Sequence, residues 1–87
     1  MVKNKMKSAR EEMVADLCHK IWCDWMVYVF SECLVDMKDG TMIIPAWAVK
    51  KWNRQLQTHY LDLSDEEQES DRIEARKFIE LWRMIGG

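Results

Sequence analysis

The sequence has few cysteines and no long apolar run, and both shortages limit the class of protein. Its three cysteines are an odd number without regular spacing, which argues against a disulfide framework and favours reduced thiols in the cytoplasm. No apolar run approaches the roughly 20 residues that cross a bilayer, and no apolar signal-peptide core follows the basic N-terminus. We therefore expect a small, soluble, cytoplasmic protein that has no membrane partner.

The chain also lacks an excess of positive charge. Its 13 basic and 15 acidic residues give a formal net charge of −2, which provides no general attraction to nucleic acid. A helix-turn-helix would need a basic recognition helix, and the one candidate, 46–56, belongs to a chain that is acidic overall. We therefore expect no DNA partner.

Motifs of catalysis and metal binding are missing too. There is no glycine-rich phosphate loop, no Ser/His/Asp constellation and no paired carboxylates outside an acidic helix start, so we expect no enzyme. His19 and Cys23 lie four residues apart on one helix face, but structural zinc sites use four well-spaced ligands and no Cys-x-x-Cys pair accompanies them. The acidic run 62–71 lacks the Asp-x-Asp-x-Asp-Gly order of a calcium loop. The sequence predicts neither a metal site nor a cofactor.

The first helical stretch begins at a capping-box pattern, Ser8 with Glu11, and runs toward Asp36. Apolar residues at spacings of three and four predict a buried stripe made up of Val14, Leu17, Ile21, Trp25, Tyr28 and Leu34 or Val35. The stripe is widened to nearly the whole circumference by Trp22, Met26, Val29, Phe30 and Cys33. A helix of this kind is central, or it packs on another copy of itself. Because 87 residues can scarcely cover so wide an apolar belt, we also expect a homo-oligomer.

The rest of the chain predicts an irregular connection and two more helices. An Asp-Gly turn precedes the β-prone segment 42–44, which is too short to found a sheet and has no second clear strand to pair with. Pro45 suits the first turn of a helix that ends near Leu56, with core positions Trp47, Val49, Trp52 and Leu56. The last helix runs from Asp65 to about Met84, with core positions Ala75, Phe78, Ile79, Trp82 and Ile85.

The fold class that follows is all-α. We expect a flexible basic leader at residues 1–7 and a single domain at 8–87. That domain would be a small three-helix domain with one partly extended connection at about 37–45. Eighty-seven residues suffice for one modest core but not for two.

The start of the last helix carries the most specific pattern. From Tyr60 the chain reads Tyr-x-x-Leu-Ser-x-x-Glu and then Asp-Arg-x-x-Ala, and Ser64 with Glu67 forms a second capping box. This run resembles the signature of the ryanodine-receptor repeat (RyR) domain, with His59 in place of the usual proline and Gln68 in place of the usual lysine. The His-x-x-Trp that begins at residue 19 is similar to one in the first helix of that family. The resemblance covers 19–25 and 60–79, whereas 37–57 departs from the family.

The resemblance implies a function as well as a fold. RyR-like domains occur in calcium-release channels and as small stand-alone proteins of bacteria and phages, where they look like binders of nucleotide-derived ligands. A free-standing copy without an attached effector looks like a phage protein that acts against host defence in the host cell cytoplasm. It would sequester a nucleotide-derived immune signal, such as a cyclic nucleotide or an ADP-ribose-like molecule.

A nucleotide-type ligand needs flat rings on which its base can stack and cationic donors for its phosphates. Lys51 and Arg54 lie near Trp47 on one helix face, and Arg72 could present a bidentate fork to a phosphate while Asp71 holds His19 or a ligand hydroxyl. The candidate ligand-binding residues are His19, Trp22, Trp25, Lys51, Arg54, Tyr60, Asp71 and Arg72.

Each of these residues also has a structural interpretation. The tryptophans can simply fill the core, and Asp71 and Arg72 can pair with groups on neighbouring helices and lock the packing. Five tryptophans in 87 residues are nevertheless more than a core of this size usually requires. Surplus indole rings are typical of pockets and interfaces. The alternative function is therefore an interaction module that binds and inhibits a host protein through a Trp-rich surface.

Overall fold

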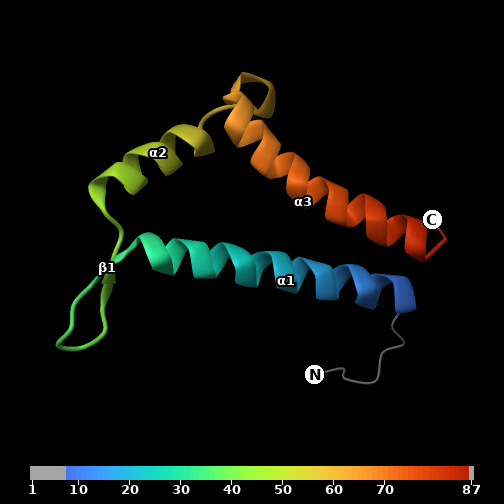
Figure 1. The fold of residues 1–87 in the computed structure, drawn as a ribbon, viewed down its shortest axis with the longest axis horizontal. Coiled ribbons are helices and arrows are strands. Elements are labelled where there is room, and N and C mark those ends of the chain that lie inside the picture. The colour runs from blue at the N-terminus through green and yellow to red at the C-terminus, as the bar shows by residue number, and fades with distance from the viewer. Residues whose placement is uncertain (1–7, 87) are drawn as a thin grey trace.

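The computed structural model describes residues 8–86, and three helices make up most of them (Figure 1). The elements are α1 (Ala9–Glu32), α2 (Ala46–Leu56) and α3 (Asp65–Met84), with a short 3-10 turn, Tyr60–Asp62, between the last two helices. This arrangement confirms the small three-helix domain that the sequence predicts. The expected leader, residues 1–7, lies outside the described residues.

Serine side chains cap the two long helices where the sequence predicts it. The Ser8 hydroxyl accepts a hydrogen bond from the backbone N–H of Glu11, at 3.4 Å, where α1 begins. At the start of α3 the Ser64 hydroxyl accepts from the backbone N–H of Glu67, and the Glu67 carboxylate accepts from that of Ser64, both at 3.2 Å. Each cap satisfies donors that a helix start leaves unpaired, so these two ends are locally encoded.

The chain between α1 and α2 differs from the expectation. α1 ends at Glu32, so Leu34 and Val35 do not continue its apolar stripe. They form β1 (Leu34–Val35), which pairs antiparallel with β2 (Met42–Ile43). The expectation that residues 42–44 have no partner strand is therefore wrong.

The turn of this hairpin explains the difference. Gly40 adopts a φ of 78°, a value that glycine reaches without a steric penalty. Its N–H donates to the carbonyl of Asp36, and the Asp36 N–H donates to the carbonyl of Thr41, both at 2.8 Å. These two bonds close the turn and bring its β-prone flanks into register, which ends α1 early.

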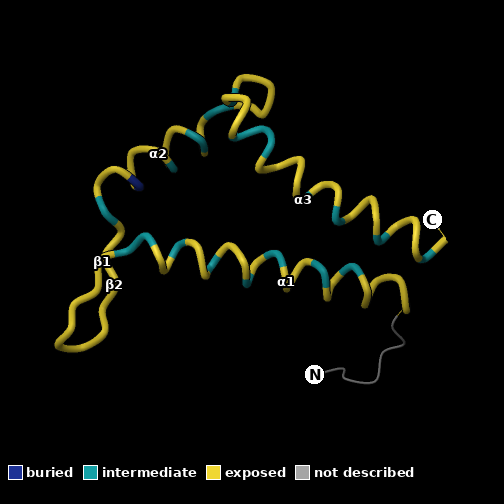
Figure 2. The backbone as a smooth tube through the Cα atoms, viewed as in Figure 1, coloured by how far each residue is buried: buried dark blue, intermediate teal, exposed yellow. Residues whose placement is uncertain are grey.

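The three helices lie in one open layer. α1 and α3 converge where the N-terminus of α1 approaches the C-terminus of α3, while α2 spans the wide end (Figure 1). The radius of gyration is 17.4 Å. A compact chain of this length would have about 12 Å. Among the described residues only Ala48 is buried, and the rest of the tube is coloured intermediate or exposed (Figure 2).

The apolar stripe expected on α3 does not face the rest of the chain. Phe78, Ile79 and Trp82 are exposed, and so is Ala75; of the predicted core positions only Ile85 is half-buried. On α2, likewise, Trp52 is half-buried but the other three predicted core positions are exposed. The predicted core is therefore wrong for most of α2 and α3.

The rotation of α3 about its axis has a local cause. The Glu67 carboxylate pairs with the guanidinium of Arg54 on α2 and is the least exposed side chain of that pair, at 9%. Glu67, Glu74 and Leu81 follow one another at seven-residue intervals and share a face. Anchoring Glu67 to α2 turns this face inward and therefore turns the more apolar stripe outward.

Candidate functional site

Among residues 8–86 a large cavity lies between α1, α2 and the first half of α3, and we refer to it as the central groove. Its volume is about 1040 Å³. The apolar lining residues are Ile21, Trp25, Tyr28, Trp52, Leu56 and Leu63. The charged ones are Asp24, Glu66, Glu67, Asp71 and Glu74, with Lys51 as the basic member. The groove therefore combines an apolar wall with a border rich in carboxylates.

Aromatic rings from α1 and α2 build that wall. The ring centroid of Trp52 lies 5.7 Å from that of Trp25 and 6.3 Å from that of Tyr28. Trp25 and Tyr28 are 5.4 Å apart, and Trp47 meets Trp52 edge-on at 6.4 Å. Tilted and edge-on pairs at such distances are the arrangements that aromatic rings prefer, so the cluster joins α1 to α2. Trp25 remains 48% exposed, which leaves its ring accessible.

The carboxylates of the groove fall into two groups. Glu74 and Asp24 contact the ammonium group of Lys77 at 2.9 and 3.8 Å, and Glu67 contacts Arg54. The hydrogen bond from Arg54 lowers the pKa of the Glu67 carboxyl below its usual value. Across the described residues, Glu66 and Asp71 have no ion-pair partner. These two carboxylates give the border of the groove an uncompensated negative charge.

The structure brings together three of the eight candidate ligand-binding residues, Trp25, Lys51 and Asp71, which all line the central groove. His19 and Trp22 line neither the central groove nor the cavity where α1 and α3 converge. Their rings stack on each other with centroids 6.0 Å apart, and His19 Nε2 lies 3.4 Å from Cys23 Sγ. The pairing of His19 with Asp71 that the sequence suggested is not among these contacts.

The two candidate arginines are engaged by neighbouring side chains. Arg54 donates to Glu67, and Arg72 donates to Glu69 at 3.2 Å and to the side-chain carbonyl of Gln68 at 2.9 Å. The hydrogen bond to Glu69 raises the pKa of Arg72. Tyr60 lies in the 3-10 turn, where its backbone carbonyl accepts from Gln68. The hydrogen bonds of Arg72 to Gln68 and Glu69 lie within α3 itself, so they do not join it to a neighbouring helix as the structural interpretation suggested.

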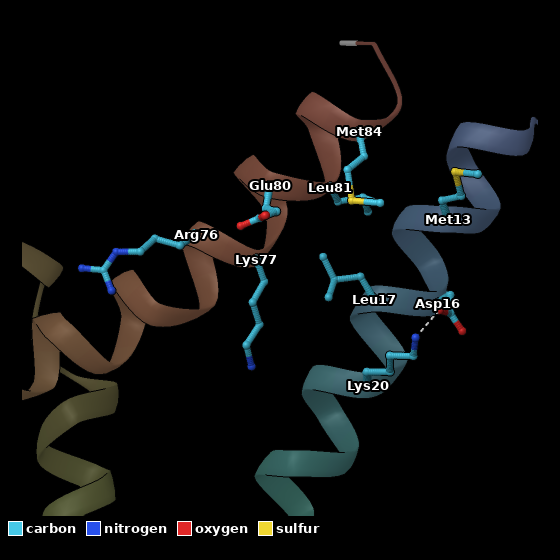
Figure 3. Close-up of a pocket in the computed structure, with 9 residues that line it drawn as sticks. All are labelled: Met13, Asp16, Leu17, Lys20, Arg76, Lys77, Glu80, Leu81 and Met84. Carbon is cyan, nitrogen blue, oxygen red and sulfur yellow. Dashed lines mark ion pairs between the residues drawn. The ribbon is translucent and has the colours of Figure 1, made fainter.

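A smaller cavity, of about 370 Å³, lies where α1 and α3 converge. Leu17, Leu81 and Met84 point into the space between the helices, with Met13 nearby (Figure 3). Charged side chains of both signs surround them, and Asp16 pairs with Lys20 at 2.9 Å. The apolar packing at this end is thin, and three basic and two acidic side chains border it, so we assign it a structural role.

No known family model matches the sequence, and no curated protein or solved structure matches it. The resemblance to the RyR domain therefore stays a prediction that rests on its motifs. Within residues 8–86, no three or more His, Cys, Asp or Glu side chains come together as a metal site. In the same residues, no helix combines the length and apolar character that a membrane span requires.

Several groove residues were not among the candidates from the sequence. The sequence indicates Trp52 as a core position or as a ring on which a base could stack, and it places Tyr28 in the buried stripe of the first helix. The acidic residues Glu67, Asp71 and Glu74 follow one another at intervals of four and three, which places them on one side of a helix. That spacing was the available signal for an acidic border, but an acidic helix start is explained equally well by the helix dipole.

Proposed function

We propose that this chain is a non-enzymatic protein-interaction module whose central groove binds an amphipathic, basic segment of a partner protein. The observation that carries the proposal is the combination of an open aromatic wall with the unpaired carboxylates of Glu66 and Asp71. Of the two functions that the sequence suggested, the chemistry of the groove thus favours the interaction module. Inhibition of a host protein would be one form of that function.

The shape and charge of the groove suit such a segment. Amphipathic helices dock by laying their apolar face into an apolar groove, and the wall of Trp25, Tyr28 and Trp52 provides that surface. Basic side chains at the edges of the helix would meet the carboxylates of the border. Charge complementarity of this kind speeds association and selects against acidic partners.

A nucleotide-derived ligand is a second proposal, and it has one observation in its favour. Trp25 and Trp52 lie in the same cavity as Lys51, so a base could stack beside a phosphate donor. The charge of the groove opposes this ligand, since the two unpaired carboxylates of Glu66 and Asp71 outnumber the ammonium group of Lys51 that lines it with them. Phosphates would be repelled by that border. Sequestration of an immune signal by a phage protein rests on this second proposal.

We further propose that the protein acts in the cytoplasm as a homo-oligomer. The three cysteines are free, which is typical of a reducing compartment. The open layer exposes large apolar side chains on every helix, and such surfaces mark contacts with other chains. If the protein is encoded by a phage, the compartment is the cytoplasm of the host.

A tryptophan-fluorescence titration tests the function. The probe is a short synthetic helix with leucines on one face and lysines at its edges, compared with the same helix carrying glutamates instead of lysines. We expect a saturable change with the lysine helix, weakened by added salt, and none with the glutamate helix. Equal responses to both helices, or no response to either, would contradict the proposal. A response to cyclic dinucleotides or ADP-ribose would support the second proposal instead.

A further inference from the structure

We infer that one face of α1 is the contact surface for a second copy of this chain. This face, which we call the outer face, consists of His19, Trp22, Cys23, Met26, Val27 and Phe30. Their intervals of three and four residues place them along one side of the helix. The inference specifies the homo-oligomer proposed above, and it does not depend on which ligand the central groove binds.

Most of the outer face is not covered within the chain: Cys23 and Met26 are half-buried, and the other four residues are exposed. None of its residues lines either cavity, whereas the opposite side of α1 contributes Leu17, Ile21 and Trp25 to them. Trp22 is 56%, Val27 69% and Phe30 50% exposed. Large apolar side chains in a contiguous row of this length are uncommon on the surface of a monomer. Something outside the single chain therefore covers them.

The charge of this face favours a second copy as the occupant. In a two-fold contact the same patch meets itself, so a patch with one sign of charge would repel its copy. The outer face contains no Asp, Glu, Lys or Arg, and neither does the whole stretch 25–31. The exposed stripe of α3 differs, because Arg72, Arg76 and Arg83 lie next to Ile79 on the helix surface. The outer face of α1 is thus better suited to self-contact than the α3 stripe.

The exposed area also agrees with what a stable dimer needs. The accessible surface of the chain is 7637 Å². A compact protein of 10.5 kDa would expose about 5,400 Å², so the excess is at most about 2,200 Å². This excess is an upper limit, because the accessible surface of 7637 Å² is summed over the whole chain and not over residues 8–86 alone. Stable interfaces of standard size bury about 800 Å² on each partner. The excess exposed surface of the chain is therefore large enough for such an interface. The chain also forms only one layer of helices, whereas a stable domain needs at least two packed layers.

The hairpin between α1 and α2 carries further exposed apolar side chains. It follows directly after α1, and its side chains Leu34, Val35 and Ile43 are 60%, 48% and 54% exposed. A two-stranded hairpin is marginally stable on its own in water. We expect the second copy to cover one side of it together with the outer face, which would explain why a ladder of two residue pairs persists.

Sedimentation of the full chain tests the inference. The wild type should have twice the mass of the 10.5 kDa chain. Val27→Glu and Phe30→Glu place a charge on the outer face, so each should halve the mass while circular dichroism still shows the helices. Leu61→Glu is the matched control, because Leu61 is 84% exposed in the 3-10 turn, and it should leave the mass unchanged.

The outcomes separate this inference from the proposals on which it builds. A wild type that stays monomeric at the highest attainable concentration overturns both the inference and the proposed homo-oligomer, but not the groove function. A dimer that survives Val27→Glu and Phe30→Glu overturns the assigned surface alone. Dissociation by Trp82→Glu with no effect of the two α1 variants would overturn it in favour of the α3 stripe.

Discussion

The guanidinium of Arg54 on α2 donates to the carboxylate of Glu67, the residue that completes the capping box at the start of α3. The Glu67 side chain therefore accepts a hydrogen bond from the backbone N–H of Ser64 at the start of its own helix, and it also joins that first turn to α2 through Arg54. Because α3 is one continuous helix, its rotation at Glu67 determines which side chains face α1 further along. The groove border and the outward apolar stripe both follow from this contact.

Acid should weaken the contact. The hydrogen bond from Arg54 lowers the pKa of Glu67 in the folded protein below its ordinary value of 4.5, so the unfolded chain binds more protons at acidic pH. The stabilisation is fully present above pH 4.5 and is lost as the pH falls through the lowered pKa. Glu67→Gln keeps a capping side chain but not the charge. In urea unfolding at a series of pH values, the difference in free energy of unfolding between wild type and Glu67→Gln should shrink below pH 4.5. A difference that stays constant would argue against the ion pair.

Removing the serine cap of α3 should destabilise the protein. Ser64→Ala leaves the backbone N–H of Glu67 without its acceptor, a loss that typically lowers the free energy of unfolding by about 1 kcal/mol. Urea unfolding followed by circular dichroism measures it. Ser70→Ala removes a hydroxyl from the interior of the same helix, where alanine has the higher helix propensity, and should not lower stability. If both variants are equally stable, the cap contributes nothing.

The hairpin turn should depend on the backbone freedom of Gly40. At its φ of +78° an added Cβ meets no atom within 4 Å, so Gly40→Ala would be penalised by backbone strain alone, about 1–2 kcal/mol. We expect the cross-strand nuclear Overhauser effects between Leu34 and Ile43 to weaken or vanish. Gly40→Asn should retain more of them, because asparagine tolerates this conformation better. An unchanged hairpin in Gly40→Ala would show that another contact holds it.

The parts of the fold that local sequence encodes were predictable. The helix starts at Ser8 and Ser64 depend on hydrogen bonds between residues three apart, which a pattern reveals directly. The hairpin was missed because Leu34 and Val35 also fit the apolar period of the preceding helix. Their pairing is decided by the Asp36–Thr41 turn, which competes with helix continuation.

The rotation of α3 was not predictable in the same way. Its apolar stripe at 75–82 has the spacing of a buried face, and the interpretation as core followed from that spacing. The contact that turns it outward joins Arg54 to Glu67 across an irregular link, and no periodicity in the sequence records it. The candidate site shows the same limit. The motif indicated Asp71, and the aromatic and basic patterns indicated Trp25 and Lys51, but Trp52 and Glu66 joined them only through the packing of three helices.

The border of the central groove offers the most direct test of function. Asp71→Asn and Glu66→Gln each remove one unpaired carboxylate from the groove while keeping the shape of the side chain. If the groove binds basic amphipathic segments, each variant should bind the leucine–lysine helix about two- to five-fold more weakly at low salt, the effect of one exposed charge pair. Asp65→Asn is the matched control, because Asp65 lies in the same first turn of α3 but does not line the groove. Since all three variants change the net charge equally, a loss confined to Asp71 and Glu66 would reflect their position. A uniform loss would instead indicate long-range attraction without a defined site.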